Sequence, residues 1–593
     1  MPLYTAPVKD TQFILSAVLN LNQYASLPGF TDATPDTIAA ILEAGGRFAA
    51  EVLAPLNLPG DIEGCTRHPD GRVTTPKGFP DAYNQFVSQG WGTLTAAPEY
   101  GGQGLPHVLG MAVTEYFSSA NMAFAMYPGL AEGAQSAIAA VGTPEQMAHW
   151  LPPMVAGRWT GTMNLTEPHC GTDLGLIRTR AAQNPDGTHA ITGTKIFISA
   201  GEHDLAENIV HLVLAKTEGA PDTVKGISLF IVPKFLVNPD GSLGPRNHVS
   251  CGSLEHKMGI HANSTCVMNY DAATGYLLGE EMKGLKAMFT MMNAARLGVG
   301  AQGLAIAEAA YQNAAAYAKD RRQGRALTGP ADPDASADPI IVHPDVRHML
   351  MRGKAFIEAA RALILWGALQ VDLAHKAATP EERETADDLI SLLTPVIKAY
   401  GTDKGLETAI LSQQVLGGHG YIREWGLEQF VRDARIAQIY EGTNGIQAMD
   451  LVGRKLAQNG GRALRTWLAQ VHATLADAPE IPLKTSLTKS LADLEAATLW
   501  LMQNALTNPN NAGSAATSYL NLMGHVALGH MWLLITKAST AALAAGTDDP
   551  SFHEAKLTTA RYFAEQFLPE TRMLLVRIKA GSETLMAIPV EAF

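Results

Sequence analysis

The sequence contains few cysteines: there are four in 593 residues, and no two of them form a CxxC pair. Cys65, Cys170, Cys251 and Cys266 are widely spaced, which excludes a zinc knuckle and the dense disulfide framework of a small secreted domain. We therefore expect reduced or buried thiols.

No metal site is expected either. The histidines of HKMGIH (His256 and His261) and of HPDVRHML (His343 and His348) do not have HExxH spacing, and neither pair lies beside a cysteine or a carboxylate cluster. Structural histidines that form hydrogen bonds are the preferred interpretation.

Positive charge is scarce and scattered. The chain has 44 lysines and arginines against 57 aspartates and glutamates, which gives a formal charge of −13 at pH 7. Binding to a nucleic-acid backbone depends on clustered basic residues. The composition therefore argues against a nucleic-acid partner.

Targeting and membrane signals are also missing from the pattern. The stretch MPLYTAPVKDTQFILSAVLNL lacks a basic n-region and a small-residue cleavage site, and Lys9 and Asp10 interrupt its apolar residues. No run approaches the roughly 18 apolar residues of a membrane span. We expect a cytoplasmic protein without membrane insertion.

Periodic hydrophobicity is abundant, with 47% hydrophobic residues, and the length predicts about two to four domains. After an N-terminal extension (residues 1–34), helical spacing predicts a helical domain over residues 35–158. Short β-branched runs such as KIFISAG and GISLFIVPK predict a β domain over residues 159–281. Helical spacing then predicts a four-helix bundle over residues 282–455 and an appended helical module over residues 456–593. The predicted fold class is mainly α with a central antiparallel β domain.

Gly298, Gly300 and Gly303 in GVGAQG have the spacing of a dinucleotide-binding loop. Such a loop follows a β-strand, whereas the residues before these glycines have helical periodicity. We interpret them as small residues that permit close helix packing. The Ala-, Pro- and Asp-rich residues 327–339 are predicted to form a surface loop.

Two glycine-containing stretches could bind a ligand. In MNLTEPHCGTDLGLIRTRA, Thr166, Gly171 and Thr172 supply donors for a flat polar ring or a pyrophosphate, and a polar loop without a ligand is the alternative. In QVLGGHGY, Gly417 could end a helix or let backbone amides approach a phosphate. Spacing does not separate these alternatives.

The stretch IYEGTNGIQ contains a lone carboxylate, Glu441, where a helical pattern enters the turn-forming residues 442–445. A carboxylate buried among apolar groups such as Ile439 and Tyr440 has a raised pKa, which suits a proton acceptor near neutral pH. A surface carboxylate is the alternative, and the residues alone leave both open.

Six motifs occur together and in one order: PEYGGQGL, MNLTEPHCGTD, GTKIFISAGEHD, YAKDRRQGR, QVLGGHGY and IYEGTNGIQ. This combination resembles the acyl-CoA dehydrogenase family over residues 35–456. The resemblance implies bound FAD, an acyl-CoA substrate and electron-transferring flavoprotein as the electron acceptor. It also implies that Glu441 removes the α-proton of the thioester while the β-hydrogen passes as hydride to the flavin N5.

The resemblance assigns further residues to the cofactor and the substrate. Contacts to the flavin ring are implied for Leu165, Thr166, Gly171 and Thr172, and cover of the isoalloxazine for Phe197 and Ser199. Arg321, with Gln414 and Gly418, matches residues that reach the FAD of a neighbouring subunit, which implies a homodimer or homotetramer. Thr443 and Asn444 match further FAD contacts, and Arg296 and Tyr440 match the acyl-CoA pocket.

The chain also departs from the family pattern. Residues 343–345 stand where many members carry a glutamine that touches FAD, and His169 and Cys170 replace small residues of the TEPxxGxD loop. The long form, with SLEHKMGIHANSTCVMNYD, resembles a bacterial subgroup that includes dehydrogenases of 3-methylmercaptopropionyl-CoA, which act in dimethylsulfoniopropionate degradation. Straight-chain fatty acyl-CoA substrates are the alternative. An acyl-CoA oxidase and a DNA-associated homologue are less favoured, the latter because of the charge of −13.

Overall fold

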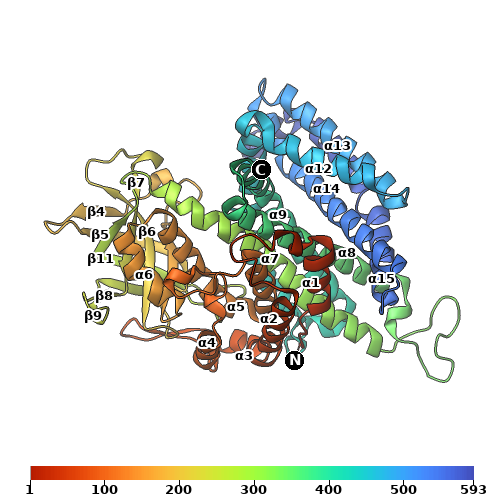
Figure 1. Cartoon of the computed structure of the whole chain (residues 1–593), viewed down its shortest axis with the longest axis horizontal. Coiled ribbons are helices and arrows are strands. Elements are labelled where there is room, and N and C mark those ends of the chain that lie inside the picture. Colours follow the sequence, from red (N-terminus) through yellow and green to blue (C-terminus); the bar gives the residue numbers. More distant parts are fainter. Residues whose placement is uncertain (1) are drawn as a thin grey trace. The chain divides into compact units, whose positions relative to one another are not determined.

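The structure is a computed structural model that describes residues 2–593, apart from the side chains of residues 290 and 293. It divides into two compact units. The helical unit comprises Met1–Gly46, Pro106–Ser119 and Val299–Phe593, and the sheet unit comprises Arg47–Leu105 and Ala120–Gly298. Figure 1 shows the long helices of the first unit and the β-sheet of the second. The mainly helical architecture with one central sheet domain confirms the predicted fold class.

The main sheet of the sheet unit has seven strands. They are β3 (Trp159–Asn164), β4 (Arg180–Gln183), β5 (His189–Ser199), β6 (Asn208–Thr217), β7 (Ile227–Pro233), β10 (Val249–Leu254) and β11 (Thr265–Leu278). The order is β10-β11-β5-β4-β6-β3, and β7 pairs with both β11 and β6. Strand β6 runs parallel to β3 and to β4, whereas the other pairs are antiparallel. The antiparallel expectation is wrong for those two pairs, because hydrophobic alternation reports which faces of a strand are buried and not the direction of its neighbour.

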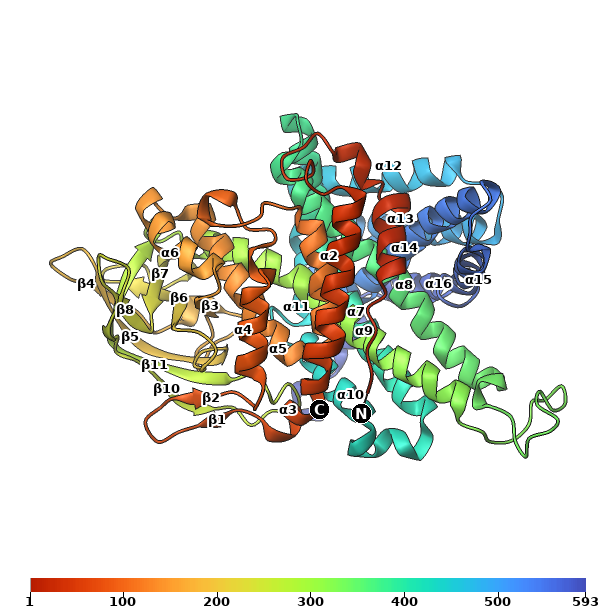
Figure 2. The ribbon, with the colours of Figure 1, turned by 60° about the horizontal axis from the view of Figure 1, so that its bottom comes forward.

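Helices and two small hairpins complete the sheet unit. The helices are α3 (Ala54–Glu63), α4 (Phe79–Ser88), α6 (Pro144–Val155), the C-terminal part of α5 (His107–Val141) and the N-terminal part of α7 (Gly284–Asp320). The hairpins are β1–β2 (Thr66–Arg67 and Val73–Thr74) and β8–β9 (Phe235–Val237 and Leu243–Arg246). The first hairpin, which helical periodicity did not predict, lies against β10, where Arg67 Nε donates to Cys251 O at 2.8 Å (Figure 2).

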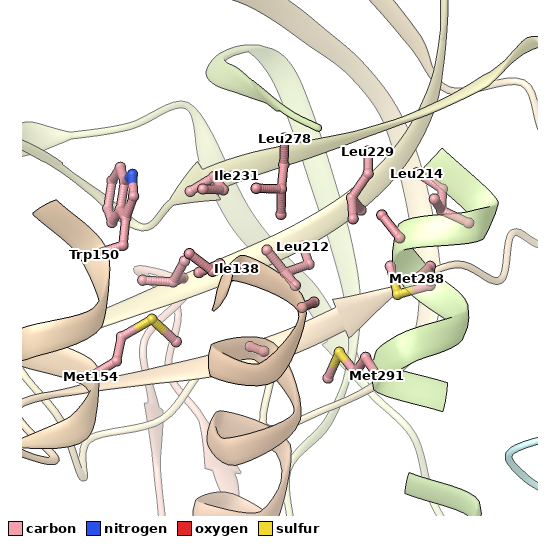
Figure 3. Packing of buried hydrophobic residues seen from close by; sticks show 14 of the residues in the cluster. Ile138, Trp150, Met154, Leu212, Leu214, Leu229, Ile231, Leu278, Met288 and Met291 are labelled. Carbon is pink, nitrogen blue, oxygen red and sulfur yellow. The ribbon is translucent and has the colours of Figure 1, made fainter. Parts of the chain in front are cut away.

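Strand β6 is buried along its whole length. Leu212 and Leu214 join the hydrophobic cluster beneath the helices, whereas Val213 and Ala215 join a second cluster. Successive side chains of a strand point to opposite faces, so a strand that is buried on both faces has a continuous apolar sequence. Figure 3 shows the first cluster, in which helical side chains meet those of the strands: Ile138, Trp150, Met154, Met288 and Met291 against Leu212, Leu214, Leu229, Ile231 and Leu278.

The helical unit is built mainly from helices, whose lengths range from 5 to 36 residues. They are α1 (Val8–Phe13), α2 (Pro35–Phe48), α8 (Pro344–Lys376), α9 (Pro380–Val415), α10 (Leu427–Ala437), α11 (Asn444–Asp450), α12 (Arg462–Asp477), α13 (Pro482–Asn504), α14 (Pro509–Ala544), α15 (Pro550–Gln566), α16 (Glu570–Lys579) and α17 (Glu583–Ala587), with parts of α5 and α7. Figure 1 shows α12, α13 and α14 beside one another, and contacts join α14 to both α12 and α13.

Two glycines of α7 confirm the predicted role in helix packing. A Cβ at Gly300 would lie 2.6 Å from Ile397 Cγ2, and a Cβ at Gly303 would lie 2.6 Å from Gly401 O on α9. Such distances are too short for a side chain, so α7 and α9 approach as closely as they do because these positions have none. Gly298 is different, since a Cβ there would meet nothing within 4 Å.

The appended helices pack directly on α8 and α9. Trp532 Nε1 of α14 donates to Ala355 O at 3.0 Å, and a Cβ at Gly524 would lie 2.4 Å from Tyr400 Cγ. Tyr400 also bonds to His525 Nδ1 at 3.2 Å. Buried polar contacts of this kind tie the module to the bundle, so residues after 456 belong to the same compact unit.

A buried cluster of charges joins five helices of the helical unit around Arg361 of α8. Its guanidinium bonds to Glu115 of α5 at 2.7 Å and to Asp10 of α1 and Glu308 of α7. Lys556 of α15 bonds to the same Asp10. A cavity of about 340 Å³ lies beside this cluster. Burial raises the pKa of Glu115 to about 7; the neighbouring Glu308 and Asp10 carboxylates raise it as well, whereas Arg361 lowers it.

The segment 327–339, the cysteines and His343 were also singled out in the sequence. Residues 327–339 form an irregular, largely exposed segment, as predicted, and it closes on Asp338, which accepts from the amides of Ala326, Ala331 and Asp332 at 2.9 to 3.0 Å. The four cysteines are free, and three of them are buried. His343 bonds to Gln323 O at 2.8 Å.

Helix α14 has an apolar character that the linear pattern did not suggest. In the part of the chain that the structure describes, it is the one helix long and apolar enough to cross a membrane by length and composition alone. However, 61% of its most apolar window is buried inside the chain. Packing against the neighbouring helices therefore accounts for this composition.

Candidate active site

Glu441 lies in the turn between α10 and α11. Its φ is +56°, and that of Gly442 is +81°, so two consecutive residues have the left-handed conformation. A residue with a Cβ adopts this conformation at a cost of roughly 1–2 kcal/mol. A glutamate is therefore found there only when other contacts hold the backbone.

Side chains from α9 and α11 hold this turn. Lys398 Nζ donates to Gly442 O and to Asn444 Oδ1, both at 2.9 Å. Gln447 Nε2 donates to Glu441 O at 3.0 Å. Lys398 and Gln447 are both fully buried. The carbonyl groups of the turn therefore face the helices, where buried donors occupy them.

The side chain of Asn444 is also used to fix the turn. Its Nδ2 donates to Thr402 Oγ1 at 3.0 Å and to Asp403 Oδ1 at 2.7 Å. Burial raises the pKa of Asp403, against the hydrogen bonds from Asn444 and Gln438. The role of Asn444 as a cofactor contact stays a prediction, because its amide already bonds to α9 at both ends.

Tyr440 and Thr443 flank the candidate base. The hydroxyl of Tyr440 donates to Gln302 on α7. Burial raises the pKa of Tyr440, and the adjacent Glu441 carboxylate raises it further. Thr443 Oγ1 accepts from Ile446 N at 3.3 Å and caps α11. Their predicted contacts to substrate and cofactor stay predictions.

Arg321, Gln414 and Gly418 are exposed at the ends of α7 and α9. The two ends are tied together by His419, whose Nδ1 bonds to the hydroxyl of Tyr317 at 2.8 Å, four residues before Arg321. At Gly418, an added Cβ would meet nothing within 4 Å. The structure therefore places these predicted residues in one region, where the backbone at Gly418 is accessible.

In the sheet unit, the predicted cofactor residues come together at the ends of two strands. Leu165, Thr166, Gly171 and Thr172 lie in the loop after β3, and Phe197 and Ser199 end β5. The amide of Ile196 donates to Thr166 O at 2.9 Å, which joins the loop to β5 just before Phe197. The loop of the second motif and the end of the strand of the third motif are thus joined.

Phe197 has two unusual properties. Its ring is 61% exposed, and its φ is +60°. An aromatic residue in the left-handed region is an outlier, and such strain is retained mainly at functional sites. The ring therefore offers an exposed flat surface beside a polar loop.

Sequence reasoning missed the residues that anchor this loop. Lys195 of β5 is fully buried, donates to Leu165 O at 3.0 Å and pairs with Glu167 at 2.9 Å. Glu167 also accepts from Thr179 Oγ1 at 2.6 Å and from Arg178 N at 2.7 Å. The available signal was a single lysine, Lys195, at the start of the hydrophobic run KIFIS. Lys398, which holds the Glu441 turn, gave a similar signal in the apolar run PVIKAY.

His169 and Cys170, which depart from the family pattern, lie beside Glu167 in this loop. Potential ligand atoms of Glu167, His169 and Cys170 lie within 4.8 Å of one another. The Glu167 carboxylate, however, is already surrounded by donors, and His169 Nε2 bonds to Leu176 O at 2.8 Å. Burial raises the pKa of Cys170, which keeps its thiol protonated. The cluster is therefore explained as an anchor of the loop.

Arg296, the remaining predicted substrate contact, lies in the N-terminal part of α7 and is 6% exposed. Its role stays a prediction.

Family models match four consecutive parts of the chain. The model described as "Acyl-CoA dehydrogenase, N-terminal domain" matches residues 39–158, and the middle-domain model matches residues 162–273. The model described as "Acyl-CoA dehydrogenase, C-terminal domain" matches residues 282–456. The last helices, residues 467–589, match a model described as "Acetyl-CoA dehydrogenase C-terminal like".

Relatives of known function are similar along almost the whole chain. A 3-methylmercaptopropionyl-CoA dehydrogenase of Ruegeria pomeroyi is 45% identical over 98% of this chain and 99% of that protein. A broad-specificity linear acyl-CoA dehydrogenase of Mycobacterium tuberculosis is 36% identical over 99% of this chain and 98% of that protein. The crystal structure of an acyl-CoA dehydrogenase from Bacillus anthracis, complexed with FAD, has a TM-score of 0.73, 22% identity and coverage of 92% and 88% of the two chains.

Proposed function

This chain belongs to the acyl-CoA dehydrogenase family, and from that premise we propose that it oxidises 3-methylmercaptopropionyl-CoA at the α,β-bond with FAD as cofactor and Glu441 as base. The observation that carries the proposal is the position of Glu441 in a left-handed turn that buried side chains hold. The similarity of 45% to a dehydrogenase of this substrate supports the choice of thioester.

The residues of the sheet unit fit a bound flavin. Lys195 and Ile196 donate to the carbonyls of Leu165 and Thr166, so the loop is anchored to β5. The exposed ring of Phe197 provides a flat apolar surface of the kind that packs on a ring system. FAD, when bound, supplies the two-electron acceptor for the β-hydride. Leu165, Thr166, Gly171, Thr172, Phe197 and Ser199 would hold its ring.

In this function Glu441 accepts the α-proton of the thioester. The α-carbon–hydrogen bond breaks towards the carboxylate oxygen, the electron pair forms the new double bond, and the β-hydrogen leaves as hydride. A general base of this kind contributes about 10²–10⁴-fold to the rate. The held turn fixes the position of the base, which reduces the entropy lost on reaching the transition state.

The remaining FAD contacts lead to a proposed dimer. Arg321, Gln414 and Gly418 would contact the FAD of a second copy, either in a homodimer or in a homotetramer. Exposed apolar side chains lie next to Gly418 in the sequence: Tyr421 is 82% exposed, Ile422 47% and Trp425 40%. Surfaces of this composition favour a protein partner.

Several finer assignments belong to the same proposal. Thr443 and Asn444 would contribute to the FAD site, and Arg296 and Tyr440 to the acyl-CoA pocket. Electron-transferring flavoprotein is the proposed acceptor, and faster flavin reoxidation in air than by that protein would indicate an oxidase. The domain limits after residues 34, 158, 281 and 455 and a cytoplasmic location also remain predictions.

A straight-chain acyl-CoA is the second candidate substrate, favoured by the 36% identity to a broad-specificity linear acyl-CoA dehydrogenase. Anaerobic bleaching of the purified flavoprotein with 3-methylmercaptopropionyl-CoA, butyryl-CoA and octanoyl-CoA separates the two. Faster bleaching by the sulfur thioester at equal, limiting concentration supports the first substrate. A preference for octanoyl-CoA assigns the enzyme to fatty acyl-CoA oxidation, and no bleaching with any thioester rejects the substrate class.

The Glu441→Gln variant tests the base. It removes the carboxylate charge but keeps the side-chain shape, so we expect unchanged FAD content and thioester binding. The bleaching rate should fall by about 10²–10⁴-fold, the contribution of a general base. A variant that retains at least a tenth of the wild-type rate would rule out Glu441 as the base.

A further inference from the structure

Lys398 of α9 is fully buried and reaches the turn that carries Glu441. Its Nζ donates to Gly442 O and Asn444 Oδ1, each at 2.9 Å. A buried ammonium requires acceptors of this kind, because a charge removed from water without hydrogen bonds is strongly unfavourable. The contacts therefore fix the lysine and the turn to each other.

The turn needs such a restraint. Glu441 has a φ of +56°, a conformation that a residue with a Cβ retains only when its surroundings enforce it. Lys398 binds the carbonyl of Gly442, and Gln447 binds the carbonyl of Glu441 at 3.0 Å. Two consecutive peptide groups are thus held by buried donors. Because the backbone fixes the Cα–Cβ bond, these donors also fix the direction in which the Glu441 side chain leaves the backbone.

We propose that Lys398 is a positioning residue that holds the Glu441 turn so that the carboxylate meets the α-carbon of the thioester, a role that rests on the proposed function of Glu441 as base. In this role Lys398 acts through Glu441. Its loss should therefore lower the rate of proton removal without changing cofactor content. A displacement of about 1 Å at a reacting group can cost about 10²-fold in rate.

The Lys398→Met variant of the full-length flavoprotein tests this role. Methionine keeps most of the side-chain length and removes the donors. We expect the rate of anaerobic flavin bleaching at saturating thioester to fall by about 10²-fold. The thioester concentration that gives half of the maximal rate and the FAD-to-protein ratio should stay within about twofold of wild type. An unchanged rate, or a rate loss explained by lost FAD, overturns the proposal.

Lys484→Met is the matched control. Lys484 of α13 also donates to a backbone carbonyl, that of Ala478 at 2.9 Å, and pairs with Glu480 at 2.6 Å. It lies in the appended helices, and neither of these two bonds involves the Glu441 turn, so its loss should leave the bleaching rate within about twofold of wild type. An equal loss in both lysine variants would show a general effect on folding and overturn the proposal.

A double-mutant cycle separates positioning from other effects. If Lys398 acts only through the carboxylate of Glu441, adding Lys398→Met to Glu441→Gln should change the residual rate by less than about twofold, since the base is already absent. If the rate loss of the double variant equals the product of the two single losses, the proposal is overturned. If Glu441→Gln alone keeps a substantial rate, Glu441 is not the base. The single Glu441 variant gives that result, so it can be distinguished from a failure of the proposal for Lys398.

Gln447→Leu provides a second variant if Lys398→Met does not fold. It removes the neutral donor to Glu441 O and leaves no new polar atom on the substituted side chain. We expect a loss of roughly 10-fold in the bleaching rate, smaller than for Lys398 because the donor is uncharged, and the same unchanged FAD content. A rate equal to that of wild type would show that restraint of these carbonyls has no effect on the base.

Discussion

Each unit of this protein contains a fully buried lysine that donates to a carbonyl of a loop that carries candidate site residues. Lys195 in the sheet unit binds Leu165 O at 3.0 Å, and Lys398 in the helical unit binds Gly442 O at 2.9 Å. The second acceptors differ. Lys195 pairs directly with Glu167 at 2.9 Å, whereas Lys398 donates to the amide of Asn444, which in turn donates to Asp403.

We expect this difference between the second acceptors to separate effects on folding stability from effects on the position of the candidate base. A lysine paired with a buried carboxylate compensates its charge, so the loss of either partner leaves an unpaired charge in the interior. A lysine that donates to a carbonyl and an amide restrains the backbone at both sites. We therefore expect changes at Lys195 to act mainly on folding and flavin retention, and changes at Lys398 to act mainly on catalysis.

The largest expected effect on stability is that of Lys195→Met. It leaves Glu167, which is 3% exposed, without its cation, and the free energy of unfolding should fall by about 3–5 kcal/mol. The loop at Leu165 loses its anchor, so the FAD-to-protein ratio should fall as well. Denaturant titration and the flavin absorbance of the purified variant measure both effects.

The double variant Lys195→Met with Glu167→Gln sharpens this comparison. Glutamine removes the unpaired charge and keeps an oxygen that can accept from Thr179 and Arg178, so part of the unfolding free energy should return while flavin retention stays low. Recovery of both the unfolding free energy and the FAD-to-protein ratio would contradict a role of Lys195 in shaping the loop. A Lys195→Met variant that keeps its FAD and loses only turnover would contradict the distinction between the two lysines.

Glu167 of the sheet unit and Glu115 of the helical unit should make the stability depend on pH in opposite directions. Burial raises the pKa of Glu167, but Lys195 and the donors around the carboxylate outweigh burial and hold it below its ordinary value. Its stabilisation is present above its unfolded pKa and is lost as the pH falls through the folded value. Burial raises the pKa of Glu115 from 4.5 to about 7. The folded chain thus holds a proton that the unfolded chain has lost, so stability falls as the pH rises from 4.5 to about 7.

Glu115→Gln tests this difference, because glutamine imitates the protonated side chain at every pH. For wild type, this group should lower the free energy of unfolding by up to about 3 kcal/mol between acidic and neutral pH. The variant should lack that part of the slope in denaturant titrations at pH values from about 5 to 7.5, the range set by the two pKa values. The same slope in both proteins would show that Glu115 is ionised in the cluster.

The smallest effect compares two glycines of α7, one from each unit. Gly303→Ala places a Cβ 2.6 Å from Gly401 O, so we expect a loss of about 1–3 kcal/mol in unfolding free energy through overpacking. Gly298→Ala meets nothing within 4 Å and should be neutral or stabilising by about 0.5–1 kcal/mol, because alanine favours a helix. Equal effects in thermal unfolding would contradict the packing role of Gly303.

Local patterns predicted much of the fold but not the strand directions. Helical spacing identified the long helices, and the context of Gly300 correctly indicated packing rather than a nucleotide loop. The parallel pairing of β6 with β3 and β4 depends on how distant strands meet, which alternation within one strand does not encode. The β1–β2 hairpin, with strands of two residues each, was too short to give a period.

The sequence by itself determined the order of helical and sheet segments and the family, because hydrophobic period and ordered motifs are properties of neighbouring residues. It also singled out Glu441 as an isolated carboxylate in a turn. Only the tertiary structure decided how that turn is held, since Lys398 lies 43 positions before Glu441 along the numbered chain. Hydrogen bonds between buried groups join residues by distance in space, and burial of a lone lysine becomes visible only when the helices around it have packed.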